Sequence, residues 1–213
     1  MSRLILLFGA LLCALASVYA FSWAVDEYDL WQIEEHVGRW DAAGAIDDDR
    51  ALAAHITAVG QIIARRPAHP RAHLLAARLY EWLAYLQRIN PRHEREQLTN
   101  AERHLLAAIS DRPFWGRAWG ALAVVSAKRD RAWTPLVQSR FDTALRLGRY
   151  DSDTQLYLVN ISLTQWQRMP EAARETAAKF LRQTLPNDGP AMDYVRRSFR
   201  HPAYREILSS IGS

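Results

Sequence analysis

The chain has 213 residues, of which 49% are hydrophobic and 23% charged, and its formal net charge is +4. This length and apolar content fit one folded domain with its own core and exclude a disordered chain. The single cysteine, Cys13, excludes an intrachain disulfide, a CxxC redox pair and a cysteine-based zinc site.

The first predicted element is a transmembrane helix. Leu4 to Val25 is a run of 22 residues without a charge, preceded by Arg3 and followed by acidic residues. A helix of that length measures about 33 Å, against about 30 Å for the hydrocarbon core of a bilayer. The charge asymmetry predicts a cytoplasmic N-terminus and an exported body. We therefore expect residues 1–25 to be a signal anchor; a signal peptide cleaved after Ala20 is the alternative.

An acidic segment follows the apolar run. Residues 26–49 hold nine acidic residues and one basic residue, whereas the chain from Arg50 onward holds 25 basic and 14 acidic residues. Apolar residues three and four positions apart predict a helix over 27–43, namely Leu30, Ile33, Val37 and Trp40. The run Asp47 to Asp49 is typical of the start of the next helix. We expect 26–49 to be a juxtamembrane helix and linker, and the first half of a first helical hairpin.

The remainder, 50–213, predicts a helical domain. Amphipathic segments alternate with short breakers rich in proline and glycine, and no segment has the alternation of a strand. The expected helices span 50–66, 71–89, 95–110, 114–128, 134–148, 152–168 and 170–184, with a short helical tail near 190–210 as a cap. The predicted fold class is all-α.

Residues 101–126 carry an ordered pattern of small, large and helix-breaking residues. Small residues stand at Ala101, Ala108 and Ala123, large apolar residues at Leu105, Trp119 and Leu122, and Pro113 separates the two helical runs. A helix packed between two others needs small side chains where backbones approach and large ones where the gap is wider. The pattern resembles the tetratricopeptide repeat.

This resemblance implies an α-solenoid of about four hairpins, 27–66, 71–110, 114–148 and 152–184. The same offsets recur after Pro67, where they select His73, Ala76, Ala77 and Tyr80. The last unit departs from the pattern, because Arg149 replaces the proline and Gln155 replaces the tryptophan. End repeats of a stack are expected to be atypical, since one of their faces meets solvent.

The sequence predicts no catalytic residue, metal site or cofactor. His69 and His73 are four apart, as metal ligands on a helix can be, but Pro70 places His69 in the preceding turn. No nucleophile elbow or phosphate-binding glycine motif is present. We therefore expect a protein that is not an enzyme.

The tetratricopeptide resemblance also implies a partner-binding groove lined by the first helix of each hairpin. Carried over to this chain, the predicted groove residues are Arg71, Arg78, Glu81, Trp82, Arg117, Lys128 and Asn160. Three arginines, a lysine and a tryptophan on the exposed side would suit an acidic peptide, a carboxylate terminus or an acidic sugar chain. The alternative is that these are ordinary solvated side chains.

Two phrases, RPFWGRAWGALA and ALRLGRYDSDTQLYLVNISLTQW, resemble the VpsP-type accessory proteins of bacterial exopolysaccharide synthesis. The resemblance covers roughly 50–170. It implies a non-catalytic scaffold that is anchored in the bacterial inner membrane through residues 4–25 and whose soluble domain lies in the periplasm. Protein partners are expected, an acidic polymer is a second possibility, and nucleic acid is not expected. The alternatives are a chaperone module of cytochrome c maturation and a protein that binds acidic glycan or lipid directly.

Overall fold

The computed structural model describes residues 2–185, 189–199, 201, 204 and 206–209, with side chains from residue 7 onward. Within these residues every regular element is a helix, which confirms the all-α prediction. The chain divides into two compact units, Met1–Asp47 and Asp48–Ser213.

The first unit consists mainly of one helix, α1 (Ser2–Ala43). The predicted membrane segment and the predicted helix over 27–43 are therefore one continuous element, because no proline or glycine interrupts the chain between them. Side chains from residue 7 to residue 25 are all exposed. By length and composition α1 can cross a membrane, a property that a signal sequence shares. The helix ends at Gly44, whose φ of +67° is the left-handed conformation that glycine adopts most easily.

The second unit contains the remaining helices. They are α2 (Asp49–Arg65), α3 (Pro70–Leu86), α4 (Pro91–Asp111), α5 (Gly116–Asp130), α6 (Pro135–Gly148), α7 (Ser152–Gln165), a short 3-10 helix η1 (Trp166–Arg168), α8 (Glu171–Thr184) and α9 (Pro190–Ser198). Each helix predicted over 50–184 is present. Of the predicted tail near 190–210, α9 is described, and residues 200, 202–203, 205 and 210 lie outside the described residues.

Side-chain caps set the starts of several helices. Asp48 accepts a hydrogen bond from a backbone amide in the first turn of α2, so the aspartate run starts a helix as predicted. Asn90 caps α4 in the same way, and Pro91 occupies its first position, so α4 begins at residue 91 rather than at 95. Thr134 and Asp151 cap α6 and α7.

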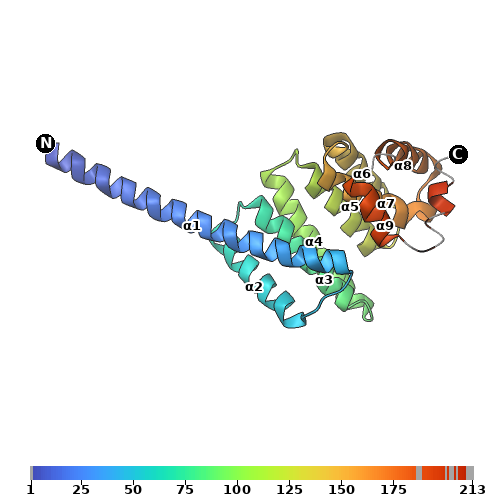
Figure 1. Ribbon diagram of the computed structural model, residues 1–213, viewed down its shortest axis with the longest axis horizontal. Coiled ribbons are helices and arrows are strands. Elements are labelled where there is room, and N and C mark those ends of the chain that lie inside the picture. The colour runs from blue at the N-terminus through green and yellow to red at the C-terminus, as the bar shows by residue number, and fades with distance from the viewer. Residues whose placement is uncertain (1, 186–188, 200, 202–203, 205, 210–213) are drawn as a thin grey trace. The chain divides into compact units, whose positions relative to one another are not determined.

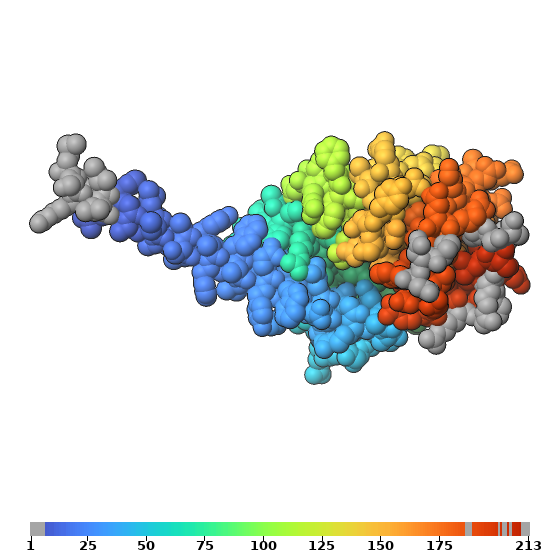
Figure 2. All heavy atoms as spheres, turned by 45° about the horizontal axis from the view of Figure 1, so that its top comes forward, coloured from blue at the N-terminus to red at the C-terminus, as the bar shows by residue number. Residues whose placement is uncertain are grey.

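Helices α2 to α7 pack mainly against their neighbours in sequence, and α5 also packs against α7 and α7 against α9. The ribbon follows this order from cyan through green and yellow to red (Figure 1). In the space-filling view the colours of the second unit succeed one another in the same order (Figure 2). Alternate helices α5, α7 and α9 therefore form a row.

One hydrogen bond recurs in three alternate turns between helices, those that precede α3, α5 and α7. The side chain of Trp119 donates through Nε1 to the Pro113 carbonyl oxygen at 2.8 Å. His73 Nε2 lies 2.8 Å from the carbonyl oxygen of Pro67, and Gln155 Nε2 donates to that of Arg149 at 2.8 Å. In each case a residue in the first turns of a helix bonds to the carbonyl six positions earlier. The turns 67–73, 113–119 and 149–155 thus share one local structure despite their different residues.

Helix α5 lies at the centre of the second unit. Gly116, Ala118 and all residues from Gly120 to Ala127 are buried. Two clusters of buried apolar side chains flank the helix, and Trp119 and Tyr157 pack against both of them. The core of this unit is therefore continuous through α5.

Candidate partner-binding face

The predicted groove residues lie on three helices of the second unit. Helix α3 carries four of them, α5 carries two and α7 carries one. The structure brings four of them together, three on α3 and Lys128 on α5, whereas Arg117 and Asn160 each contact a residue that was not predicted. We name the surface formed by α3, α5 and α7 the A face.

The first place joins α3 to α5 through Glu81 and Lys128. Lys128 Nζ lies 2.7 Å from Glu81 Oε2, and Arg78 Nη1 lies 3.5 Å from the same oxygen. The Glu81 side chain is buried, whereas that of Lys128 is 44% exposed. One carboxylate thus holds two cations at the edge of solvent.

The electrostatics of Glu81 follow from this geometry. Burial would raise the pKa of its carboxyl, but the charges of Lys128 and Arg78 outweigh burial and hold the pKa below its usual value. Glu81 is therefore an anion at neutral pH. It neutralises part of the positive charge that the sequence suggested for this surface.

Aromatic rings continue the contact between α3 and α5 toward the end of α3. Trp82 packs edge-on against Tyr85, with ring centroids 5.5 Å apart, and the Arg78 guanidinium lies 5.8 Å from the Trp82 ring centroid. The expectation that Trp82 is exposed is wrong, because only 8% of it is accessible. Tyr85 is the ring that faces solvent. Arg88 covers part of that ring, at 4.1 Å from its centroid.

Two further places join the later helices of the row. Arg117 on α5 pairs with Asp153 on α7 at 3.1 Å. Asn160 on α7 donates to the Tyr194 hydroxyl on α9 at 2.6 Å. Arg117 therefore ties α5 to α7 within the A face, and Asn160 ties α7 to α9 at its end.

The remaining predicted residue, Arg71, is half-buried in the first turn of α3. The sequence analysis missed Asp153, Tyr194 and Tyr85, each of which contacts a predicted residue. Asp153 could have been found from its place in the first turn of α7, level with the first turn of α5. No signal in the sequence pointed to Tyr194, because it lies on α9, a helix that belongs to no predicted hairpin.

A buried polar network lies between α4, α5 and α6. Arg140 Nη1 lies 2.6 Å from Glu102 Oε1 and also contacts the Ser126 hydroxyl. Arg129 pairs with the second oxygen of Glu102. Glu102, Arg140 and Ser126 are all buried. Buried charges that are paired and hydrogen-bonded in this way fix the relative position of the helices that carry them.

A hollow of about 200 Å³ opens beside this network, between the start of α4 and the end of α5. It is lined by Pro91, Glu94, Arg95, Leu98, Lys128, Arg129, Asp130 and Arg131. Its charges are largely paired, because Arg131 contacts Glu94 at 2.6 Å and Arg129 contacts Asp130 at 2.8 Å. Hydrogen bonding from Arg129 lowers the pKa of Asp130 below its usual value.

Two histidines meet between α3 and α4. The Nδ1 atoms of His73 and His104 lie 2.9 Å apart, and Tyr80 stacks on the His104 ring. Because a carbonyl only accepts, the contact with Pro67 places a proton on His73 Nε2, so neutral His73 accepts at Nδ1 from His104. Burial, with smaller contributions from His73 and Arg103, lowers the pKa of His104 to about 4.

The described residues contain no group of three or more His, Cys, Asp or Glu side chains that could hold a metal ion. The polar groups of the A face form ion pairs and hydrogen bonds between helices.

The chain was compared with protein-family models, curated proteins and solved structures. No family model matches it, and neither does a curated protein or a solved structure.

Proposed function

We propose that this protein is a non-catalytic, membrane-anchored adaptor that assembles proteins of an envelope polysaccharide system. Its helical unit is a tetratricopeptide-like α-solenoid of about four hairpins. Helix α1 anchors it in the bacterial inner membrane, and the helical unit lies in the periplasm. The partner is a protein that docks on the A face.

The single observation that carries the proposal is the hydrogen bond repeated in the turns 67–73, 113–119 and 149–155. It repeats at the positions that the tetratricopeptide pattern selects. The packing of α5 against α7 and of α7 against α9 supports a stack in which alternate helices form one face. Repeat stacks of this kind bind partners on an extended surface.

The composition of the A face supports a protein partner. Tyr85 presents an accessible ring beside Arg88, Arg78 lies against the neighbouring Trp82 ring, and Lys128 is partly exposed. Tyrosine and arginine are enriched among the residues that dominate binding energy in protein interfaces. Because Glu81 already neutralises part of this charge, we expect a partner segment that carries only a few acidic residues.

The polysaccharide context rests on the resemblance of RPFWGRAWGALA and its companion phrase to the VpsP-type accessory proteins. The membrane location is supported by the exposed apolar segment of α1. The fold by itself would not select this process, because one helical repeat fold serves many partners.

Site-specific crosslinking in intact membranes tests the proposal. The photoreactive amino acid p-benzoylphenylalanine replaces Tyr85 in the full chain, and the crosslinked proteins are identified by mass spectrometry. We expect glycosyltransferases, polymerases or export proteins. Recovery of the intact N-terminal peptide in the membrane fraction would show that α1 is retained.

The matched control places the same crosslinker at Ser139, an exposed residue of α6 outside the A face. Equal crosslinking at both positions would argue against the A face as the docking surface. Recovery of haem-ligation proteins instead would support a chaperone of cytochrome c maturation. If no protein were captured at Tyr85, the adaptor proposal would fail and direct glycan or lipid binding would replace it.

A further inference from the structure

Two turns of the second unit end in exposed aromatic rings. Phe114 is 81% exposed and Tyr150 is 87% exposed. Each immediately precedes the N-cap of the next helix, which is Trp115 for α5 and Asp151 for α7. The two rings therefore occupy equivalent positions in two alternate turns, those before α5 and α7. Water-exposed rings of this size at a repeated position indicate a surface that meets an apolar environment.

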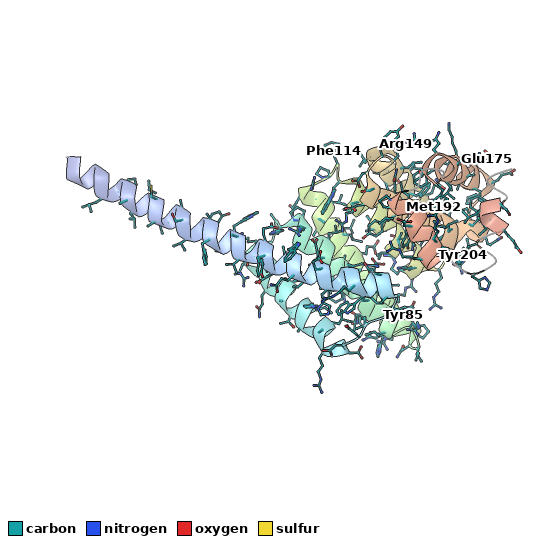
Figure 3. All side chains as sticks on the ribbon, viewed as in Figure 1. Tyr85, Phe114, Arg149, Glu175, Met192 and Tyr204 are labelled. Atoms are coloured by element: carbon teal, nitrogen blue, oxygen red, sulfur yellow. The ribbon has the colours of Figure 1, made fainter. Side chains whose placement is uncertain are left out.

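The two turns lie side by side. A Cβ atom built on Gly116 would come within 2.9 Å of the Gly148 backbone, so the start of α5 directly adjoins the end of α6. Figure 3 shows Phe114 and Arg149 at one edge of the unit and Tyr85 at the opposite edge. We name the surface formed by Arg112, Phe114, Arg149 and Tyr150 the aromatic edge.

An arginine accompanies each turn. The Arg149 guanidinium lies 5.3 Å from the Tyr150 ring centroid, and Arg112 lies 4.9 Å from the ring centroid of Trp115. Arg149 also donates to the side-chain oxygen of Gln183 at 2.6 Å. The cations are thus held beside the rings.

The acidic residues of these turns are mostly engaged elsewhere. Asp151 accepts hydrogen bonds from the amide and the hydroxyl of Thr154. Asp153 pairs with Arg117, and residues 111–117 and 146–153 together hold four arginines and three aspartates. The aromatic edge therefore carries a small positive charge together with two protruding rings.

We propose that the aromatic edge docks into the interface of an anionic bilayer. Aromatic rings favour the headgroup region of a membrane, and arginines are attracted to anionic lipids. Protruding rings can insert between lipids, whereas a peptide ligand would need a groove. Two rings give weak binding on their own, but a chain held by α1 presents them at high effective concentration. The inference rests on the proposed function only for the retained anchor.

Fluorescence quenching in reconstituted vesicles tests this docking. The full chain, with Cys13→Ser, carries one new cysteine at Phe114 or at Tyr150, labelled with the fluorophore NBD. The vesicles contain two parts phosphatidylcholine and one part phosphatidylglycerol. We expect quenching by spin-labelled lipid, relative to quenching by aqueous iodide, to be several-fold stronger than at the control position Ile89. Ile89 is 93% exposed and lies in the turn between α3 and α4.

Equal quenching ratios at Phe114, Tyr150 and Ile89 would overturn the docking. A ratio that falls when the protein is diluted in lipid would also overturn it, because the rings would then meet a second copy. Docking further requires that Arg112→Gln with Arg149→Gln lowers the ratio while circular dichroism shows an unchanged fold. Carbonate extraction reports the anchor separately. A chain that resists extraction but shows equal ratios would refute this inference and leave the proposed function standing.

Discussion

The two junctions along the A face are built differently. Between α3 and α5 the contact runs through long polar side chains, Glu81 and Lys128, at 2.7 Å. Between α5 and α7 the helices approach so closely that a Cβ atom added at Gly120 would lie 2.9 Å from the Cβ of Tyr157. The first junction depends on an ion pair, and the second depends on the absence of a side chain at Gly120.

This difference predicts that the α3–α5 contact can adapt to a ligand and that the α5–α7 contact is rigid. A long ion pair with one exposed partner can rearrange at little cost when a ligand supplies another charge. A glycine contact cannot widen without losing packing on both sides. We therefore expect a partner to be accommodated where α3 meets α5, while α5, α6 and α7 act as a rigid support.

The largest expected effect is at Trp119, which packs against both core clusters. Trp119→Ala removes that packing and the hydrogen bond to Pro113, and we expect it to lower the free energy of unfolding by about 3–5 kcal/mol. Urea denaturation followed by circular dichroism measures the loss. Trp119→Phe keeps most of the ring and loses the hydrogen bond, so we expect about 1 kcal/mol. A Trp119→Ala protein of unchanged stability that no longer captured its partner would make Trp119 a contact residue instead.

A second glycine contact of the rigid support, the junction of α6 with α7, is tested next at Gly148. A Cβ atom there would lie 2.5 Å from the Thr154 hydroxyl oxygen and 2.7 Å from its carbons. We expect Gly148→Ala to cost about 2–3 kcal/mol because α6 and α7 must move apart. Gly60 is the matched control, since a Cβ atom at this exposed position of α2 meets nothing within 4 Å. Gly60→Ala should instead stabilise by about 0.5–1 kcal/mol, and equal effects at both sites would contradict the rigid junction.

The charged junction is tested at Lys128. Lys128→Met removes the nearer cation from buried Glu81, and we expect a loss of about 1–2 kcal/mol in the free energy of unfolding. In a Glu81→Gln background the same substitution should cost much less, because no buried anion remains to be paired. A double-mutant cycle from chemical denaturation gives the coupling. A coupling near zero would show that the pair contributes nothing to the junction.

The sequence predicted most of the helices well because their starts and ends depend on local chemistry. Pro113 and the cap Asp48 act within a few residues of where they stand, whereas the cap at Asn90 was not predicted and α4 begins four residues earlier than expected. It predicted the candidate face less well. The burial of Trp82 and the link from Asn160 to Tyr194 depend on helices far away in the chain. A periodic pattern shows which side of a helix is polar, but it does not show which polar groups already satisfy one another.

The smallest expected effect is the dependence of stability on pH that His104 causes beside the turn 67–73. Equivalent positions in the three turns are held by His73, Trp119 and Gln155. Among these three, His73 is the residue that contacts a second histidine, His104 on the neighbouring helix α4. The pKa of His104 is lowered from 6.5 to about 4, so between these values the unfolded chain binds more protons than the folded one. Stability must then fall as the pH drops from above 6.5 toward 4, and this contribution is constant at higher pH.

Because His104 is only partly buried, we expect a loss of about 1 kcal/mol, or about 2–4 °C in Tm. Differential scanning calorimetry across this pH range measures it, with His104→Gln as the variant whose Tm should change less. Hydrogen exchange shows where the structure is weakened. As the pH falls, protection of the backbone amides should decrease in α3 and α4 before it decreases in α5 and α7. If acidification instead loosened α5 and α7 first, protonation of His104 would not be the cause of the lost stability.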